Sequence, residues 1–314
     1  MAHRLGVYAN RSRYILLLAF AICAAGCGPT DYQKPLQQFS DASAIVAASA
    51  TSYLNNMNTV EQEAQVDRLA FEAKAIDLKG VEKNVIISPA EITLRSQAIS
   101  VLSAYTSNLA DLASRKPGTA IGQSATALSA SMKKIATDAG AFNNPKIDNA
   151  KFSGLASAAA SAMGAVAQLI INHKARRDIE ASLESNEKPI EDLIDLIGNE
   201  LTLAYERQKA ALGAQRVYLT KAYSIEQAAV VSDSTKRLNI AAQINSYRRQ
   251  EELLRAANPS ASVTKMKSAF VALVAYAHSD KDPKTIAALW QAVQDFSAAA
   301  QPLGQAIQSL VAAS

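Results

Sequence analysis

The 314-residue chain carries 32 basic and 28 acidic side chains, and almost half of its residues are hydrophobic. Three of the basic residues precede Tyr14, and without them 29 basic residues face 28 acidic ones. This balance excludes a strongly basic, nucleic-acid-binding protein. The chain has only two cysteines, Cys23 and Cys27. A framework of several disulfides is therefore excluded as well, and a hydrophobic core must hold the fold.

The first 26 residues differ from everything that follows. Arg4, Arg11 and Arg13 give a positive start without an acidic residue, and an uncharged apolar run follows over 14–22. This run is too short to span a bilayer, which takes about 20 residues in a helix. A basic flank, a short apolar run and small residues after it are typical of a cleaved secretory signal peptide.

Small residues lead directly to a cysteine in the sequence Ala24-Ala25-Gly26-Cys27. The segment resembles the lipobox of bacterial lipoproteins, although that family prefers Leu at the position of Ala24. The resemblance implies cleavage between Gly26 and Cys27 and lipidation of the Cys27 thiol. Three acyl chains at this residue would make release from a membrane negligible.

The lipobox divides the chain into a signal peptide over 1–26, a lipidated tether over 27–35 and one helical-bundle domain over 36–314. The residue after the lipidated cysteine is Gly28 rather than the Asp that resembles an inner-membrane retention signal. We therefore expect localisation in the cell envelope, at the outer membrane and on its periplasmic face.

Helix signals fill the remaining sequence. Ser88-Pro89-Ala90-Glu91 combines an N-cap serine, a proline in the first turn and a capping-box glutamate. Short links favour antiparallel neighbours, so we predict an all-α, elongated antiparallel helical bundle. The expected helices span 36–56, 60–79, 89–115, 119–139, 146–184, 189–230, 233–256, 261–278, 283–300 and 303–312.

Two of these predicted helices, 146–184 and 189–230, are long and coiled-coil-like. At 1.5 Å per residue each reaches roughly 60 Å. Near seven-residue spacing of apolar or small residues predicts a packing seam in the second helix, interrupted by Gln208 and Gln215. The seam consists of Ile190, Ile194, Ile197, Leu201, Ala204, Ala211 and Tyr218.

The segment 152–171 contains no charged residue, but it is rich in alanine, serine and glycine. Its length would permit a membrane span, whereas its composition is only marginally lipophilic. Small residues on all sides favour a helix enclosed by its neighbours, and a segment that leaves the bundle to enter lipid is the alternative. The candidate membrane-interacting residues are Phe152, Leu155, Val166, Leu169, Ile170 and Ile171.

Residues for catalysis or metal binding are scarce. After the signal peptide the only histidines are His173 and His278, and neither has the spacing of a paired metal ligand. No nucleophile elbow or phosphate-binding loop is recognisable. We expect no enzyme activity, no metal and no cofactor. One acidic cluster, whose charge suits the start of a helix, consists of Glu184, Glu187, Glu191, Asp192 and Asp195.

These observations predict an envelope lipoprotein that acts by contact, as a non-catalytic helical binding or scaffolding protein. Its expected partners are the lipid bilayer, through Cys27, and a protein partner or a second copy of itself, but not nucleic acid. The alternative is a membrane-active, pore-forming-like protein that uses 152–171. Long helices beside an uncharged segment loosely resemble the layout of cytolysin A-type pore-forming toxins, without any shared residue motif.

Overall fold

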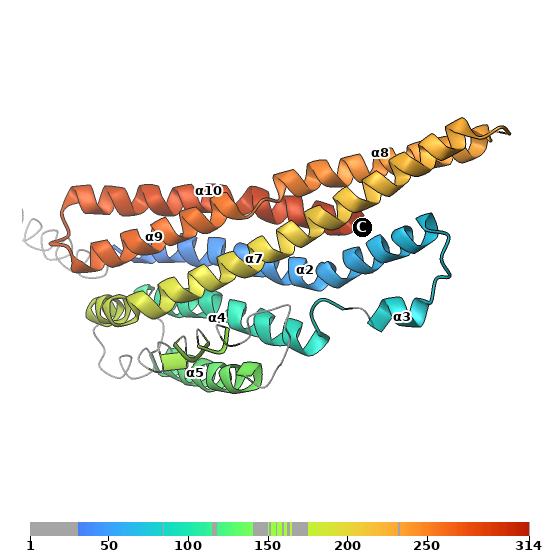
Figure 1. The fold of residues 1–314 in the computed structure, drawn as a ribbon. Helices are drawn as coiled ribbons and strands as arrows, with labels where there is room; N and C mark the ends of the chain where they lie inside the picture. Colours follow the sequence, from blue (N-terminus) through green and yellow to red (C-terminus); the bar gives the residue numbers. More distant parts are fainter. Residues whose placement is uncertain are drawn as a thin grey trace, which may run out of the picture.

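The computed structural model describes residues 31–83, 85–114, 118–140, 175–231 and 233–313, with short stretches between 150 and 164. In these ranges every regular element is an α-helix and no strand is present, which confirms the predicted all-α bundle. The helices, shown in Figure 1, are α2 (Gln33–Phe71), α3 (Leu78–Lys83), α4 (Pro89–Ala113), α5 (Gly118–Gly140), α7 (Ala175–Ala228), α8 (Ser234–Ala256), α9 (Ser260–His278) and α10 (Pro283–Ala313).

Helix α2 lies at the centre of the bundle. It packs against α4, α7 and α10, while α9 packs against both α7 and α10. Phe39 of α2 has its ring 5.3 Å from that of Phe296 in α10 and 6.4 Å from that of Phe270 in α9. One continuous apolar core therefore joins helices from both ends of the sequence, and burial of this core holds the fold without disulfides.

Three predicted breaks between helices are absent, and the helix predicted to run to 79 ends at Phe71 instead, before α3. Helix α7 continues through the link expected at 185–188, with Pro189 inside it, and α10 likewise contains Pro302. Helix α2 passes through the break expected at 57–59. A proline removes one backbone hydrogen bond. In α7 the buried face continues on both sides of Pro189, from Leu183 to Ile194, so packing outweighs that loss.

The start of α4 is formed as the sequence predicts. The Ser88 hydroxyl accepts a hydrogen bond from the Glu91 backbone amide, and the Glu91 carboxylate accepts one from the Ser88 amide in return. Just before this cap, Asn58 of α2 accepts hydrogen bonds from the amides of Ile86 and Ile87. The cap and the asparagine together fix where the chain enters α4.

The first described residues are held at one end of the bundle. Tyr32 is fully buried, its ring lies 4.9 Å from that of Tyr276 in α9, and its hydroxyl donates to Glu180 of α7 at 3.4 Å. The Tyr276 hydroxyl in turn donates to Asp31. Helix α2 starts at Gln33, three residues before the predicted start, because these contacts order the chain already at 31 and 32. Residues 31–35 thus belong to the folded body rather than to a free tether.

Candidate functional site

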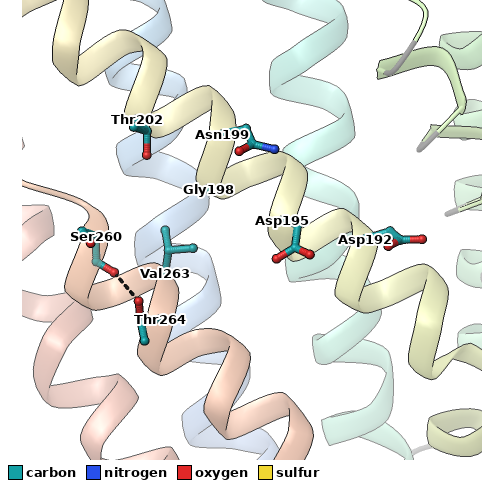
Figure 2. A pocket seen from close by; sticks show the side chains of 8 residues that line it. All are labelled: Asp192, Asp195, Gly198, Asn199, Thr202, Ser260, Val263 and Thr264. Carbon is teal, nitrogen blue, oxygen red and sulfur yellow. Dashed lines mark hydrogen bonds between the residues drawn. The ribbon is translucent and has the colours of Figure 1, made fainter.

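Two residues of the acidic cluster of α7, Asp192 and Asp195, lie along a shallow groove between α7 and α9, drawn in Figure 2. The groove has a volume of about 480 Å³. Gly198 forms its floor, because a Cβ atom there would lie only 2.7 Å from Cγ1 of Val263. The groove is lined by Asp192, Asp195, Gly198, Asn199, Thr202, Ser260, Val263 and Thr264.

The charged groups of this groove are paired with one another. Nζ of Lys267 in α9 lies 2.8 Å from the Asp195 carboxylate, and Nζ of Lys188 lies 2.6 Å from the Asp192 carboxylate. The Thr264 hydroxyl donates to the backbone carbonyl of Ser260 within α9. The described part of the chain contains no group of three or more His, Cys, Asp or Glu side chains that could hold a metal ion. One ion pair, between Lys267 and Asp195, thus joins α7 to α9 beside the groove, while the pair of Lys188 and Asp192 lies within α7.

Only one of the two histidines lies in the described part of the chain. His278 is exposed at the end of α9, with Nδ1 3.6 Å from the carboxylate of Glu184. His173 lies outside the described residues, as do Gly26 and Cys27, the residues of the predicted cleavage and lipidation site. The signal peptide and the lipid site therefore stay predictions from the sequence.

A buried ion pair joins α4 to α7. Nε of Arg95 donates to the carboxylate of Glu200 at 3.1 Å, and both side chains are almost fully buried. Burial raises the pKa of Glu200, while the charge of Arg95 and its hydrogen bond oppose this rise. The Arg95 guanidinium also lies 4.7 Å from the ring centre of Phe152. This arrangement orients α4 and α7 and covers the pair with an aromatic ring.

Phe152 is the one candidate membrane-interacting residue that the structure describes, and it is 1% exposed in the core. Leu155, Val166, Leu169, Ile170 and Ile171 lie outside the described residues. Within the described ranges no helix combines the length and hydropathy needed to cross a membrane. Moving Phe152 into lipid would uncover the ion pair of Arg95 and Glu200, which is costly.

Helices α7 and α8 continue past the rest of the bundle as an antiparallel pair, at the upper right of Figure 1. The last aromatic residue of α2, Phe71, packs on Tyr218 of α7 with ring centres 5.4 Å apart. On the other side, Gln250 of α8 donates to the carbonyl of Ala313 at the end of α10. The two helices lose their neighbours beyond these contacts, and we call residues 219–249 the arm.

A polar junction marks the base of the arm. The fully buried Gln215 donates through Nε2 to Asp67 of α2 at 3.1 Å, and the Tyr247 hydroxyl of α8 donates to the same oxygen at 3.2 Å. Burial and the Asp67 carboxylate raise the pKa of Tyr247, so its hydroxyl stays protonated. Asp67 is thus the residue that joins the three helices, and Gln215, which interrupts the predicted seam, supplies the hydrogen bond from α7. The apolar seam positions from Ile190 to Ala211 are buried as predicted.

The end of the arm is unusually apolar. Four of the nine large hydrophobic side chains that are exposed in the described ranges lie within 14 residues there, and we call these four the tip. Val230 and Val231, in the link between the helices, are 104% and 89% exposed. The tip consists of Ile225, Val230, Val231 and Leu238. Sequence reasoning missed it, although two adjacent valines at the end of the predicted helix 189–230 were a visible signal.

Comparisons with protein families, with curated proteins and with solved structures gave no match for this chain. The geometry of the chain itself must therefore indicate the function. Its most distinctive features are the buried Tyr32 at the start of the folded body, the long helix α7 and the arm with its tip.

Proposed function

We propose that this protein is a lipid-anchored, non-catalytic binding or scaffolding protein of the cell envelope. The lipid at Cys27 holds one end of the helical body at a membrane, and the arm is presented at the other end. The anchoring membrane in this proposal is the outer membrane, with the body in the periplasm.

One observation carries the proposal: a single helix connects the anchored end with the arm. Glu180, in the second turn of α7, contacts Tyr32, and α7 ends at Ala228 beside the tip. These two positions are 48 residues apart in one helix, which corresponds to about 70 Å at 1.5 Å per residue.

The chain between the lipid and the body is short. Tyr32 follows Cys27 by five residues, so even a fully extended segment reaches no more than roughly 17 Å. The lipid would thus hold the Tyr32 end of the body close to the membrane surface. The chain enters the body at one end, and α7 and α8 extend past the other helices at the opposite end. This arrangement suits a protein that binds a partner away from its membrane anchor.

The anchor is tested by metabolic labelling with palmitate. We expect the wild-type protein to be labelled and to fractionate with membranes, whereas the Cys27→Ser variant should lose the label and change its fractionation. An unlabelled wild-type protein would contradict the anchor.

The binding role is tested by photo-crosslinking in living cells. A crosslinker is placed at Gln227 or Gln243, which are exposed on the arm, and at Ala288, an exposed control position on α10 of the body. We expect reproducible adducts with envelope components from the arm positions and fewer from Ala288. The absence of adducts at every position would contradict a role in binding.

A further inference from the structure

The tip is a convex apolar end that no other described part of the chain covers. Val230 and Val231 occupy the link itself, while Ile225 and Leu238 are 64% and 70% exposed within about one helical turn of it. Exposed apolar side chains that gather in one place mark an interaction site, whereas single ones are ordinary on protein surfaces. We therefore expect the tip to bind an apolar partner.

Both acidic and basic side chains lie beside the tip. The Glu226 carboxylate accepts a hydrogen bond from the Asp233 amide, and Asp233 accepts from the amides of Thr235 and Lys236 as the N-cap of α8. Both acidic side chains are thus engaged within the arm. The basic residues next to the tip are Lys236, which is exposed, and Arg237, which is half-buried, whereas Nζ of Lys221 lies 6.0 Å from the ring centre of Phe71 at the base of the arm.

Basic side chains beside an exposed apolar end match the two layers of a membrane surface. Apolar side chains enter the acyl region, while lysine and arginine remain at the level of the headgroups. Each basic residue near such a surface adds to the attraction by anionic lipids.

The size and shape of the tip argue against a stable protein interface. A standard interface buries about 800 Å² on each partner and involves some 20 residues or more a side. Four side chains at a convex end offer much less, and they would need a matching pocket. A bilayer needs neither a large flat area nor a pocket, because its surface adapts to the tip.

We propose that the tip inserts into the surface of a lipid bilayer that carries anionic headgroups. The insertion itself needs only the arm. That this bilayer is a different one from the bilayer that holds Cys27 rests on the proposed function, since up to about 70 Å of helix α7 lies between the two ends.

The test uses the lipidated full-length protein in donor vesicles of phosphatidylcholine. Flotation first establishes whether the protein is retained, and failure at this step contradicts the proposed anchor, not the tip. Acceptor vesicles rich in phosphatidylglycerol are then added, and their capture is measured by co-flotation. If the anchor fails, the same protein is added directly to the acceptor vesicles and its binding is measured instead.

The decisive variant is Val230→Ser with Val231→Ser. Its matched control is Val271→Ser with Val311→Ser, two valines that are exposed elsewhere, at 44% and 42%. We expect the tip variant to capture acceptor vesicles about tenfold less than wild type, because two apolar side chains no longer enter lipid. The control variant should behave as wild type. Equal capture by the tip variant, or no capture by a retained wild-type protein, would overturn the proposal.

Two further measurements test the headgroup preference and the point of contact. Acceptor vesicles of phosphatidylcholine alone should be captured several-fold less, and equal capture would overturn the anionic preference. An environment-sensitive dye on Ala229→Cys should shift its emission to the blue when acceptor vesicles are added, whereas the same dye on Ala261→Cys, exposed on α9, should not. An unchanged Ala229 dye would overturn insertion of the tip, because a captured vesicle would then be held by some other surface.

Discussion

The body and the arm share one helix but are stabilised in different ways. In the body, α7 lies against α2, α4 and α9, and its side chains at Ile190, Ile194 and Leu201 are completely buried. Beyond the contact of Lys221 with the ring of Phe71, the described part of the chain gives this helix only α8 as a neighbour in the arm, and large apolar side chains face solvent. Helices in proteins owe most of their stability to packing rather than to intrinsic propensity. The body should therefore unfold as one cooperative unit, whereas the arm can open locally.

The boundary between the two regions is set by polar residues. Gln215, Asp67 and Tyr247 join α7, α2 and α8 where α2 is about to end. Gln215 is buried while Asp67 and Tyr247 are half-buried, and the two hydrogen bonds to Asp67 favour one alignment of the three helices. This alignment determines where the arm leaves the body.

The largest expected effect is in the body. Replacing Arg95 by Met leaves the buried carboxylate of Glu200 without its partner, which typically costs about 3–5 kcal/mol of unfolding free energy. Chemical denaturation followed by circular dichroism measures this loss. The double variant Arg95→Met, Glu200→Met removes both charges and should recover most of the stability. A single variant as stable as wild type would show that the pair does not hold α4 to α7.

The same pair predicts a pH dependence. The pKa of Glu200 is raised in the folded protein, so the folded state binds its proton more tightly than the unfolded state does. Its contribution to stability is full below the unfolded pKa and is lost as the pH rises through the folded pKa. Because the Arg95→Met variant lacks the opposing positive charge, its stability should fall more steeply with rising pH than that of wild type. Parallel pH profiles for the two proteins would contradict this.

Two glycines of α7 provide a matched comparison. A Cβ at Gly198, in the body, would lie 2.7 Å from Val263, whereas a Cβ at Gly213, near the arm, would meet nothing within 4 Å. Gly198→Ala should destabilise the protein by about 1–2 kcal/mol through overpacking, net of the gain in helix propensity. Gly213→Ala should stabilise it by up to about 1 kcal/mol. Thermal melts of the two variants should move in opposite directions, and equal shifts would show that α7 is packed alike at both positions.

The helix caps distinguish global from local opening. Ser88→Ala removes the cap of α4 in the body and should cost about 1 kcal/mol of global stability. Asp233→Ala removes the cap of α8 at the end of the arm. This variant should leave the midpoint of the global unfolding transition unchanged. Instead, hydrogen exchange of amides in 219–249 should become faster. A lowered global transition in the Asp233 variant would indicate that the arm and the body unfold together.

The smallest effect is expected at the base of the arm. Arg216 of α7 lies 2.9 Å from Glu251 of α8, and the arginine side chain is 47% exposed. An exposed ion pair contributes less than about 1 kcal/mol, so Arg216→Gln should change the melting temperature very little. A loss as large as that of Arg95→Met would mean that this pair, rather than the polar junction, fixes the base of the arm.

The sequence predicted the features that depend on local patterns. The helical class, the capping box of Ser88 and Glu91 and the buried seam of α7 all follow from spacing and composition. The continuous passage of α7 through Pro189 could not be predicted in the same way, because it depends on core contacts from other helices on both sides of the proline.

The tip required the three-dimensional arrangement. Ile225 belongs to a helix whose apolar residues elsewhere form the core, whereas Leu238 belongs to α8, of which only Leu254 is fully buried. What leaves them exposed is the end of α2 at Phe71 and of α10 at Ala313, neither of which is near the arm in sequence. The local sequence pattern does not show whether segments distant in sequence will bury a side chain.

The central claim is that one end of this protein is held at a membrane while the arm extends away from it. Energy transfer from a dye on the protein to an acceptor in a phosphatidylcholine bilayer that holds the lipidated protein tests this directly. A dye on Lys34→Cys, which is exposed two residues after Tyr32, should transfer strongly, and a dye on Ala229→Cys should transfer little across the additional distance of about 70 Å. Equal transfer from both positions, or none from Lys34, would contradict the account.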